Sequence, residues 1–238
     1  MKLEISWKEK AKKAAALEAV KHVRDGFIVG LGSGSTAAYA IAEIGRKIRE
    51  EEIEILGIPT STQAFYQAIK HGIPITTLDE HPTVDLTIDG ADQIDRNLNL
   101  IKGMGGALTR EKIVAASSKK VIIIADETKL VEKLGENKHP IPIEIIPFAA
   151  KLVASKIGEL GGIPKLREEA KGKVGPVITD NGNYILDATF SQIENPFELN
   201  NKLKLITGVV ETGLFLKLAH KAILGKKDGK LIEINRNR

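Results

Sequence analysis

The first half of the chain alternates short apolar runs with helix-like stretches, and this alternation restricts the possible folds more than any other feature of the sequence. The apolar runs cover about 27–31, 53–58, 73–77, 84–88 and 120–125. The helix-like stretches cover 7–24, a segment starting near 37, about 62–71 and about 109–118. Strands joined through single helices imply right-handed parallel crossovers. The pattern therefore predicts an α/β fold with a doubly wound, mostly parallel, Rossmann-like sheet and helices on both faces.

The pattern changes near residue 135, where prolines alternate with isoleucines up to residue 147. A helix-like stretch at 148–160 comes next, then an Asn-Gly pair at 181–182 between two β-rich runs, then a helix-like stretch at 196–205. Asn-Gly between such runs is a strong hairpin signal. The order of these elements predicts a small α+β unit of the β-α-β-β-α-β, or ferredoxin-like, type.

These two patterns suggest how the chain divides into domains. Residues 135–208 should form the small α+β domain. Residues 1–134 together with 209–238 should form the Rossmann-like domain, because a hairpin with its turn at 226–230 ends the chain and is expected to rejoin the first sheet.

Composition excludes several classes of chemistry. The 238 residues contain no cysteine, which removes disulfides, thiolate nucleophiles and Cys-ligated zinc. The net charge of +4 arises from 35 basic and 31 acidic residues, a balance typical of a salt-bridged surface rather than a nucleic-acid-binding face. No apolar run reaches the roughly 20 residues that cross a bilayer, and the start of the chain is too charged for a signal peptide. We therefore expect a soluble cytoplasmic protein that binds neither nucleic acid nor membrane.

A glycine-rich loop at 32–37 lies between the first predicted strand and the following helix. It matches the relaxed dinucleotide fingerprint G-x-G-x-x-A. However, the next strand, 53–58, is not followed by the acidic residue that would hold an adenine ribose, and the loop lacks the Gly-Lys of a P-loop. The sequence favours a helix N-terminus that presents backbone N–H groups and the hydroxyls of Ser33, Ser35 and Thr36 to a phosphate or a sugar hydroxyl. A tight turn capped by one of these hydroxyls is the alternative.

Two carboxylates, Asp89 and Asp92, follow the apolar run at 84–88, with only Gly90 and Ala91 between them. The carboxyl end of a parallel strand is where open α/β sheets bind their ligands. Capping of a turn, metal binding, contacts to sugar hydroxyls and proton transfer all remain open for this pair. A calcium loop is disfavoured because the spacing after Asp92 places an isoleucine where a ligand is needed, and no histidine stands nearby for a transition metal.

Lys102 precedes a glycine-rich segment, 103–106, and the helix after it carries Glu111 in its first turn. Glycines allow the backbone to come close to a ligand, and Lys102 supplies a positive charge. For Glu111 the alternative is an exposed carboxylate favoured by the helix dipole. Lys129, just after another strand, has an equally plain interpretation as a surface lysine. Because all these segments follow predicted strand ends, they are expected to share a crevice whose acids, lysines and hydroxyls fit proton transfer on a phosphorylated polyol.

Together these motifs resemble the type A ribose-5-phosphate isomerase family. The resemblance rests on 32–36, 89–92 and 102–112 and, more loosely, on 208–210 with 213–215, and it extends over nearly the whole chain. It implies reversible conversion of D-ribose 5-phosphate to D-ribulose 5-phosphate through an enediolate, in the non-oxidative branch of the pentose phosphate pathway. It also implies that no metal and no organic cofactor is needed, and that the protein is a homodimer or homotetramer.

The resemblance also implies roles for individual residues. Glu111 would be the base that moves a proton between C2 and C1, and Lys102 with nearby N–H groups would stabilise the enediolate oxygen. Asp89 and Asp92 would hold sugar hydroxyls, and Asp89 would also assist ring opening. Met104 stands where the family is expected to have a glycine. The substrate-binding residues implied are Ser33, Gly34, Ser35, Thr36, Asp89, Gly90, Ala91, Asp92, Lys102, Gly103, Met104, Gly105, Lys129 and Lys12.

Two other functional classes are weighed against an isomerase. A non-catalytic sugar-phosphate sensor, as in some transcription regulators, is disfavoured because only about 25 residues precede the first strand, too few for a helix-turn-helix domain. Such a sensor also has no need of Glu111. A nicotinamide-dependent oxidoreductase is disfavoured by the missing acidic residue after residue 58.

Overall fold

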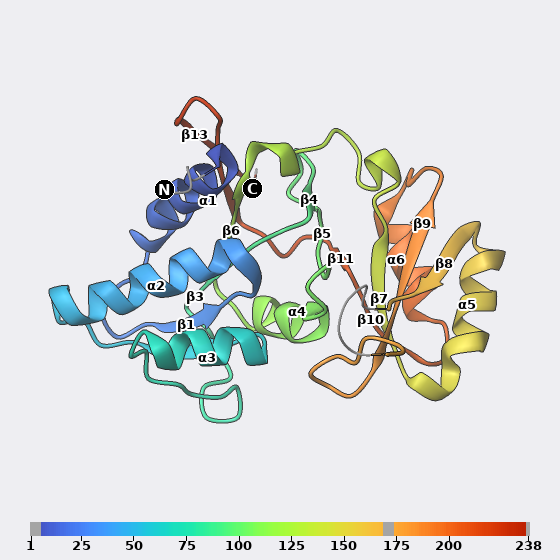
Figure 1. Ribbon diagram of the computed structural model, residues 1–238, viewed down its shortest axis with the longest axis horizontal. Helices are drawn as coiled ribbons and strands as arrows, with labels where there is room; N and C mark the ends of the chain where they lie inside the picture. Colours follow the sequence, from blue (N-terminus) through green and yellow to red (C-terminus); the bar gives the residue numbers. More distant parts are fainter. Residues whose placement is uncertain (1–5, 169–173, 237–238) are drawn as a thin grey trace. The chain divides into compact units, whose positions relative to one another are not determined.

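The structure is a computed structural model that describes residues 6–168 and 174–236 (Figure 1). Contacts between Cα atoms divide these residues into two compact units. Unit 1 consists of 6–91, 110–130 and 217–236, and unit 2 consists of the described residues of 92–109 and 131–216. The chain therefore passes from one unit to the other four times.

A six-stranded sheet in the order β13-β12-β6-β3-β1-β2 forms the centre of unit 1 (Figure 1). Its strands are β1 (Ile28–Leu31), β2 (Leu56–Pro59), β3 (Leu86–Asp89), β6 (Val121–Asp126), β12 (Lys221–Gly225) and β13 (Leu231–Asn235). All neighbours are parallel except the antiparallel pair β12 and β13. From β1 the chain runs outward to β2 and then returns to β3 on the other side, so the carboxyl ends of β1 and β3 meet at a topological switch point.

Helices cover both faces of this sheet, as predicted. They are α1 (Trp7–Val20), α2 (Gly34–Glu51), α3 (Thr62–Lys70) and α4 (Leu108–Ala116), with a 3-10 turn, η1 (Glu127–Lys129). Residues of α1, α2 and α3 pack with Val29 and Leu31 in the main core cluster. Val114 of α4 belongs to a separate cluster, against which Ile28 packs. Since adjacent residues of a strand point to opposite faces, α4 packs on the face opposite to the main cluster. The doubly wound α/β architecture is thus confirmed.

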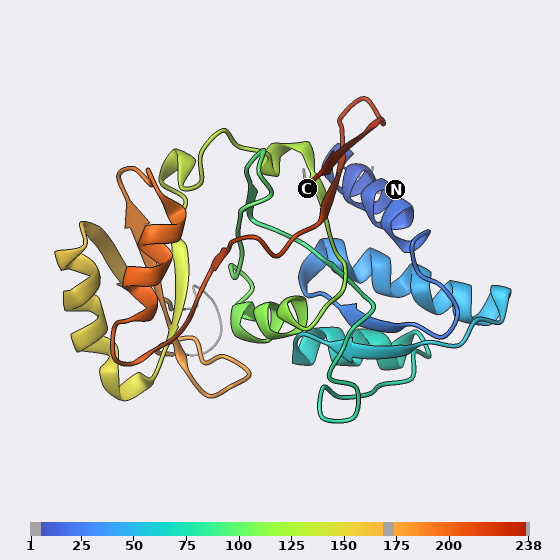
Figure 2. The ribbon, with the colours of Figure 1, turned by 180° about the vertical axis from the view of Figure 1, so that it is seen from behind.

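The C-terminal hairpin returns to the first sheet, as expected. β12 pairs in parallel with β6, and the turn closes with a hydrogen bond from Lys226 N to the oxygen of Lys230 (2.9 Å). Both views show the red hairpin beside the blue α1 (Figures 1 and 2). A Cβ at Gly225 would lie 2.1 Å from the carbonyl oxygen of Ala11, so α1 packs directly on β12. The strand expected at 73–77 is absent; only one bridge, Gly57 to Ile75, forms there.

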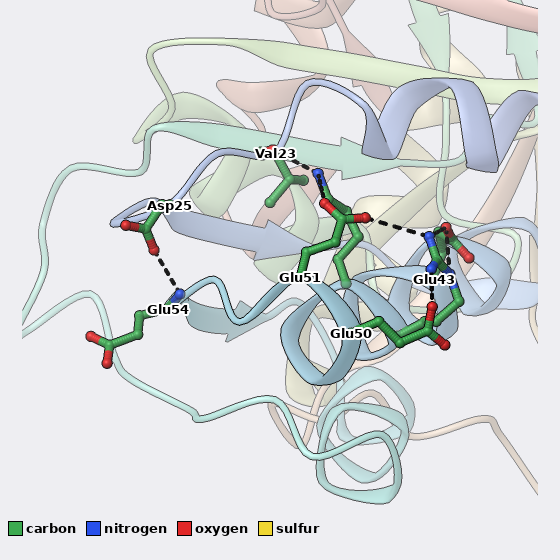
Figure 3. A network of polar contacts seen from close by, with 8 residues as sticks. Val23, Asp25, Glu43, Glu50, Glu51 and Glu54 are labelled. Carbon is green, nitrogen blue, oxygen red and sulfur yellow. Dashed lines mark hydrogen bonds and ion pairs between the residues drawn. The ribbon is translucent and has the colours of Figure 1, made fainter.

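A network of charged side chains surrounds the C-terminal half of α2 (Figure 3). Arg46 is at its centre and pairs with Glu43 (2.6 Å), Glu50 and Glu51 (3.6 Å). Lys47 Nζ donates to the carbonyl oxygen of Val23 (3.2 Å), which ties the helix to the segment before β1. The network holds the far end of the helix whose first turn carries the glycine-rich loop.

Unit 2 contains a four-stranded antiparallel sheet in the order β10-β7-β9-β8. Its elements are β7 (Ile141–Ile145), α5 (Ala150–Glu159), β8 (Gly162–Leu166), β9 (Tyr184–Phe190), α6 (Pro196–Lys204) and β10 (Val209–Thr212). Alternate residues of β7 and β9 pack with Val153 and Ile157 of α5 and Leu203 of α6 in one core cluster, so both helices cover the same face. This arrangement is the predicted ferredoxin-like β-α-β-β-α-β unit.

A second, three-stranded antiparallel sheet in unit 2 has the order β11-β5-β4. Its strands are β4 (Gln93–Ile94), β5 (Leu100–Ile101) and β11 (Leu214–Phe215), and two 3-10 turns, η2 (Glu136–Lys138) and η3 (Pro147–Ala149), complete the unit. β5 leads directly into Lys102. None of the helices in the two described ranges is long and apolar enough to span a membrane.

The contact-based division differs from the expected domain boundaries at three places. Residues 209–216 were expected in the Rossmann-like domain, but β10 pairs with β7 and β11 with β5, so they belong to unit 2. Residues 92–109 and 131–134 join unit 2 as well. The short strands β10 and β11 take their place from partners distant in sequence, β7 and β5, which local patterns do not reveal.

The hairpin expected around Asn181 and Gly182 is half correct. The turn exists, since Gly182 N donates to the oxygen of Thr179 (2.9 Å), but the described residues directly before it, 174–180, form no strand, and β9 pairs with β8 instead. The reason lies in the side chains of this segment. Thr179, Asn181 and Asn183 all donate to the buried carboxylate of Glu144, so the segment is held as a loop.

Candidate active site

The glycine-rich loop and the end of β3 meet at the switch point of the unit 1 sheet. Asp89 is 2% exposed, and its Oδ1 accepts hydrogen bonds from the backbone N–H groups of Ser33 (3.1 Å) and Gly90 (2.7 Å). A Cβ at Gly32 would lie 2.3 Å from Asp89 Oδ1 and 2.5 Å from Asp89 Cα. Only glycine therefore allows the loop to pass this close to β3, and the two hydrogen bonds fix the orientation of the carboxylate.

Three hydroxyl groups cluster beside this carboxylate. Ser33 Oγ lies 2.8 Å from Thr60 Oγ1 and donates to Ser61 Oγ at 2.6 Å. Ser33 is the N-cap residue of α2, but its side chain makes no capping hydrogen bond. The Ser33 hydroxyl therefore does not cap the turn, which was the alternative interpretation of this loop. The sequence reasoning missed Thr60 and Ser61, although their position just after β2, at the carboxyl edge of the sheet, was the available signal.

Lys12 lies beside the first turn of α2. Its Nζ is 2.7 Å from Glu9 Oε1 and 3.3 Å from Ser35 Oγ. Glu9 Oε2 also accepts a hydrogen bond from the hydroxyl of Tyr39 (2.8 Å), and the hydrogen bonds from Lys12 and Tyr39 lower the pKa of Glu9. Thr36 is half-buried in the same turn. The structure thus brings one basic side chain to the predicted phosphate-binding loop.

Lys129 ends η1, the turn that follows β6, and its side chain is half-buried. The carboxylate of Asp126 accepts a hydrogen bond from Thr128 N (3.0 Å) and so starts the turn. Because β6 and β3 are neighbouring parallel strands, Lys129 and Asp89 both follow the carboxyl edge of the same sheet.

Glu111 is 5% exposed in the first turn of α4. The alternative of an exposed carboxylate is therefore wrong. A position in the first helical turn favours a negative charge, whereas burial disfavours it. The hydroxyl of Thr109, in the same turn, donates to Glu144. A buried carboxylate of this kind is a candidate for function rather than for surface solubility.

In unit 2, Lys102 is 3% exposed, and its Nζ lies 5.4 Å from the centroid of the Phe215 ring. Its backbone N–H donates to the oxygen of Gly213 (2.9 Å), and a Cβ at Gly213 would lie 2.3 Å from the oxygen of Lys102. The ring face stabilises the ammonium group through a cation–π contact. Phe215 belongs to the 213–215 segment of the family resemblance, but the sequence analysis assigned it no role. Nothing in its local sequence indicated that Lys102 would be its neighbour.

The segment after Lys102 forms a tight glycine turn. Gly103 has φ +105°, and Gly106 N donates to its oxygen (2.9 Å). Asp92 Oδ2 accepts a hydrogen bond from Met104 N (3.0 Å). Met104 does not have positive φ and its side chain is 42% exposed, so a side chain is tolerated there, and Gly105 is exposed beside it.

The predicted site residues therefore form two groups, one in each unit. In unit 1, Ser33 and Gly90 donate hydrogen bonds to Asp89, and Lys12 contacts Ser35. In unit 2, Asp92 accepts a hydrogen bond from Met104. The division falls between Ala91 and Asp92, so the two carboxylates of the motif belong to different units. In the part of the chain that the structure describes, no group of three or more histidine, aspartate or glutamate side chains is arranged to hold a metal ion.

Comparison with known proteins gives consistent matches. The family model of ribose 5-phosphate isomerase A (phosphoriboisomerase A) matches residues 56–229. The ribose-5-phosphate isomerase A of Methanothermobacter thermautotrophicus is 49% identical over 218 residues, or 92% of this chain and 95% of that protein. That of Archaeoglobus fulgidus is 52% identical over 205 residues, or 85% of this chain and 89% of that protein.

Two solved structures are similar in fold over nearly their whole length. The ribose 5-phosphate isomerase A of Methanocaldococcus jannaschii has a TM-score of 0.89 and 46% identity, covering 94% of this chain and 97% of that one. A D-ribose-5-phosphate isomerase in complex with phospho-erythronic acid has a TM-score of 0.93 and 44% identity, covering 96% and 99%.

Proposed function

Because this chain belongs to the ribose 5-phosphate isomerase A family, we propose that it interconverts D-ribose 5-phosphate and D-ribulose 5-phosphate as an aldose-ketose isomerase. The observation that carries the proposal, beside family membership, is the burial of Glu111 in the first turn of α4. The end of β2 supports the choice over a nicotinamide-dependent oxidoreductase, since Thr60 and Ser61 stand where an acidic residue would hold a ribose.

Glu111 is the proposed base. The two sugars differ by a proton on C1 or C2 and by the position of the carbonyl group, so one carboxylate can carry out both transfers. It removes the C2 proton of the open-chain aldose, which leaves an enediolate. The carboxylic acid so formed then gives the proton to C1, while the hydroxyl proton moves between O2 and O1. No electron leaves or enters the substrate.

Lys102 is the proposed partner of the enediolate oxygen. Lys102 is 3% exposed, and its ammonium group lies near the ring of Phe215. A buried, preorganised charge interacts more strongly with developing negative charge than a solvated one does. Backbone N–H groups of the turn after Lys102, that of Gly105 among them, are proposed to add hydrogen bonds to the same oxygen atoms.

Asp89 and Asp92 are proposed to bind sugar hydroxyls, with Asp89 also assisting ring opening. The hydrogen bonds from Ser33 and Gly90 support this role, because they hold the Asp89 carboxylate in one orientation. The substrate-binding residues proposed in addition are Lys12, Ser33, Gly34, Ser35, Thr36, Gly90, Ala91, Gly103, Met104, Gly105 and Lys129. Among these, the lysine-bound hydroxyl of Ser35 supports a phosphate contact at the start of α2.

The protein is also proposed to be a cytoplasmic homodimer or homotetramer. Unit 2 exposes large apolar side chains, including Phe148 (102%), Leu205 (85%) and Ile163 (74%). Exposed apolar side chains of this size are typical of surfaces that another subunit covers. Light scattering on the purified chain should give a mass two or four times that of the monomer.

The function is tested by an isomerase assay on ribose 5-phosphate with EDTA present. Wild-type protein should be active and insensitive to the chelator. Glu111→Gln removes the base and should lose at least about a hundredfold in kcat. Glu159→Gln is the matched control, because Glu159 is an exposed glutamate of α5 that pairs with the exposed Lys156 (2.8 Å), and it should keep full activity. An inactive wild type would refute the isomerase proposal, and an active Glu111→Gln would remove Glu111 as the base.

A further inference from the structure

Arg167, which follows β8 in unit 2, is a partly buried arginine whose hydrogen bonds converge on the glycine turn. Its side chain is 12% exposed. Nε donates to Asp187 Oδ2 (2.8 Å) and Nη2 to Asp187 Oδ1, which makes a bidentate ion pair with β9. Nη1 donates to the carbonyl oxygens of Gly103 (2.9 Å) and Met104 (3.0 Å). The remaining Nη2 hydrogen faces Met104 Sδ (3.9 Å), so all five N–H groups have a partner.

These contacts fix the direction of two successive peptide groups. Both carbonyl groups point at Arg167 Nη1, and every peptide bond of the described residues is trans. In a trans peptide the N–H points opposite to the C=O, so the N–H groups of Met104 and Gly105 point away from Arg167. The N–H of Met104 meets Asp92 Oδ2 (3.0 Å). The peptide between Gly103 and Met104 is thus held at both ends.

We propose that Arg167, oriented by Asp187, is a positioning residue of the isomerase: it aligns the 103–105 backbone so that the N–H of Gly105 faces the substrate on the Asp92 side of the turn. This inference rests on the proposed function, in which these N–H groups stabilise the enediolate. Arg167 itself lies on the opposite side of the turn and contacts no reacting atom. Its contribution is to keep a segment of flexible glycines in one conformation.

Arginine is required here for a geometric reason. In the planar guanidinium group, Nε and Nη2 bind the carboxylate while Nη1 binds both carbonyl oxygens. The ammonium group of lysine, by contrast, has its three donors on a single nitrogen. A turn that contains Gly103, Gly105 and Gly106 loses more conformational entropy on ordering than other sequences do, and it relaxes when an anchor is removed. A displacement of about 1 Å at a reacting group costs about a hundredfold in rate.

The test compares Arg167→Ala, Arg167→Lys and Asp187→Asn with the wild type. Arg167→Ala should lower kcat at least about tenfold and change KM less than about threefold, because the alignment matters most for charge that develops in the transition state. Added guanidinium should restore part of the lost kcat in Arg167→Ala. Arg167→Lys should remain impaired. The matched control is Arg96→Ala, which breaks an exposed ion pair with Glu132 (2.8 Å) in the same unit, and it should keep full activity.

A second measurement does not depend on activity. Hydrogen exchange of the amides at 103–106 should be faster in Arg167→Ala than in the wild type and unchanged in Arg96→Ala. If Arg167→Ala fails to fold, Arg167→Lys and Asp187→Asn serve for both measurements. Exchange unchanged in the folded variants, kcat within twofold of wild type, or a loss that follows the melting temperature without guanidinium rescue would each overturn the proposal. An inactive wild type would refute the function instead, while the exchange measurement would still decide whether Arg167 orders the turn.

Discussion

The absence of a side chain at Gly32 decides how the loop before α2 passes the end of β3. An added Cβ would lie 2.5 Å from Asp89 Cα, and a backbone atom cannot move aside as a flexible side chain can. The same close passage allows Ser33 N to donate to the buried Asp89 carboxylate (3.1 Å). A single residue type thus couples the direction of the loop to the orientation of the carboxylate.

We expect Gly32→Ala to reduce kcat/KM for ribose 5-phosphate at least about tenfold and to lower the melting temperature by several degrees, because overpacking costs about 1–3 kcal/mol. Calorimetry and the isomerase assay check both effects. Gly158→Ala is the control: a Cβ there would have nothing within 4 Å, and alanine is the better helix former. A fully active Gly32→Ala would show that this close passage is dispensable.

At the scale of single elements, α2 has a candidate site residue in its first turn and a surface network of charged side chains in its last turns. Its first turn carries Ser35, which contacts Lys12, and its last turns carry the charged network around Arg46 (Figure 3). Arg46 is 39% exposed and Glu43 20% exposed, so water and salt weaken these pairs. Several carboxylates share one guanidinium, however, and networks of this kind stabilise more than isolated pairs do.

Replacing Arg46 should test this network. Arg46→Gln leaves Glu43 and Glu50 without their cation, while Glu51 keeps its pair with Lys47 (3.4 Å), so the melting temperature should fall at low ionic strength. The difference from wild type should shrink in about 0.5 M sodium chloride, where the Debye length is roughly 4 Å. Lys21→Gln, which breaks one exposed pair with Glu18, should have a smaller effect. A salt-independent loss would show that Arg46 acts through packing instead.

At the scale of the whole molecule, histidines make stability depend on pH. Desolvation lowers the pKa of His22, His71 and His220 below the ordinary value, and neighbouring cations lower each further. All three lie in unit 1. His220 is held neutral by a specific contact, since its Nδ1 accepts a hydrogen bond from Val121 N (3.1 Å), the first residue of β6.

The sign of the pH effect follows from proton binding. Below about pH 6.5 the unfolded chain protonates these histidines while the folded chain still resists protonation, so the free energy of unfolding falls as pH falls. The melting temperature should therefore drop between about pH 7 and about pH 5, a range above that in which the lowered carboxyl pKa values act. His220→Asn keeps an acceptor for Val121 N but does not titrate, and it should reduce the drop. An unchanged drop would exclude His220 as a contributor.

Local sequence was sufficient for the alternation of strands and helices, because apolar periodicity directly reflects which face of an element is buried. It was sufficient for the β-α-β-β-α-β order of the small unit and for the return of the C-terminal hairpin to the first sheet, but not for its pairing with β6. It also selected Asp89 and Glu111, since strand ends and first helical turns can be identified from neighbouring residues. Whether Glu111 is buried could not be predicted, because burial depends on packing with distant parts of the chain.

Tertiary structure alone decided the contacts between residues far apart in sequence. Arg167 reaches Gly103 and Met104 from 64 and 63 residues away, and nothing local to it distinguishes it from a surface arginine. Phe215 beside Lys102, and Thr60 beside Ser33, are further pairs of this kind. The physical reason is that a periodic pattern records the solvent exposure of a side chain but not the identity of its partner. The sequence by itself therefore determined the elements and the reactive groups, and folding determined which groups orient them.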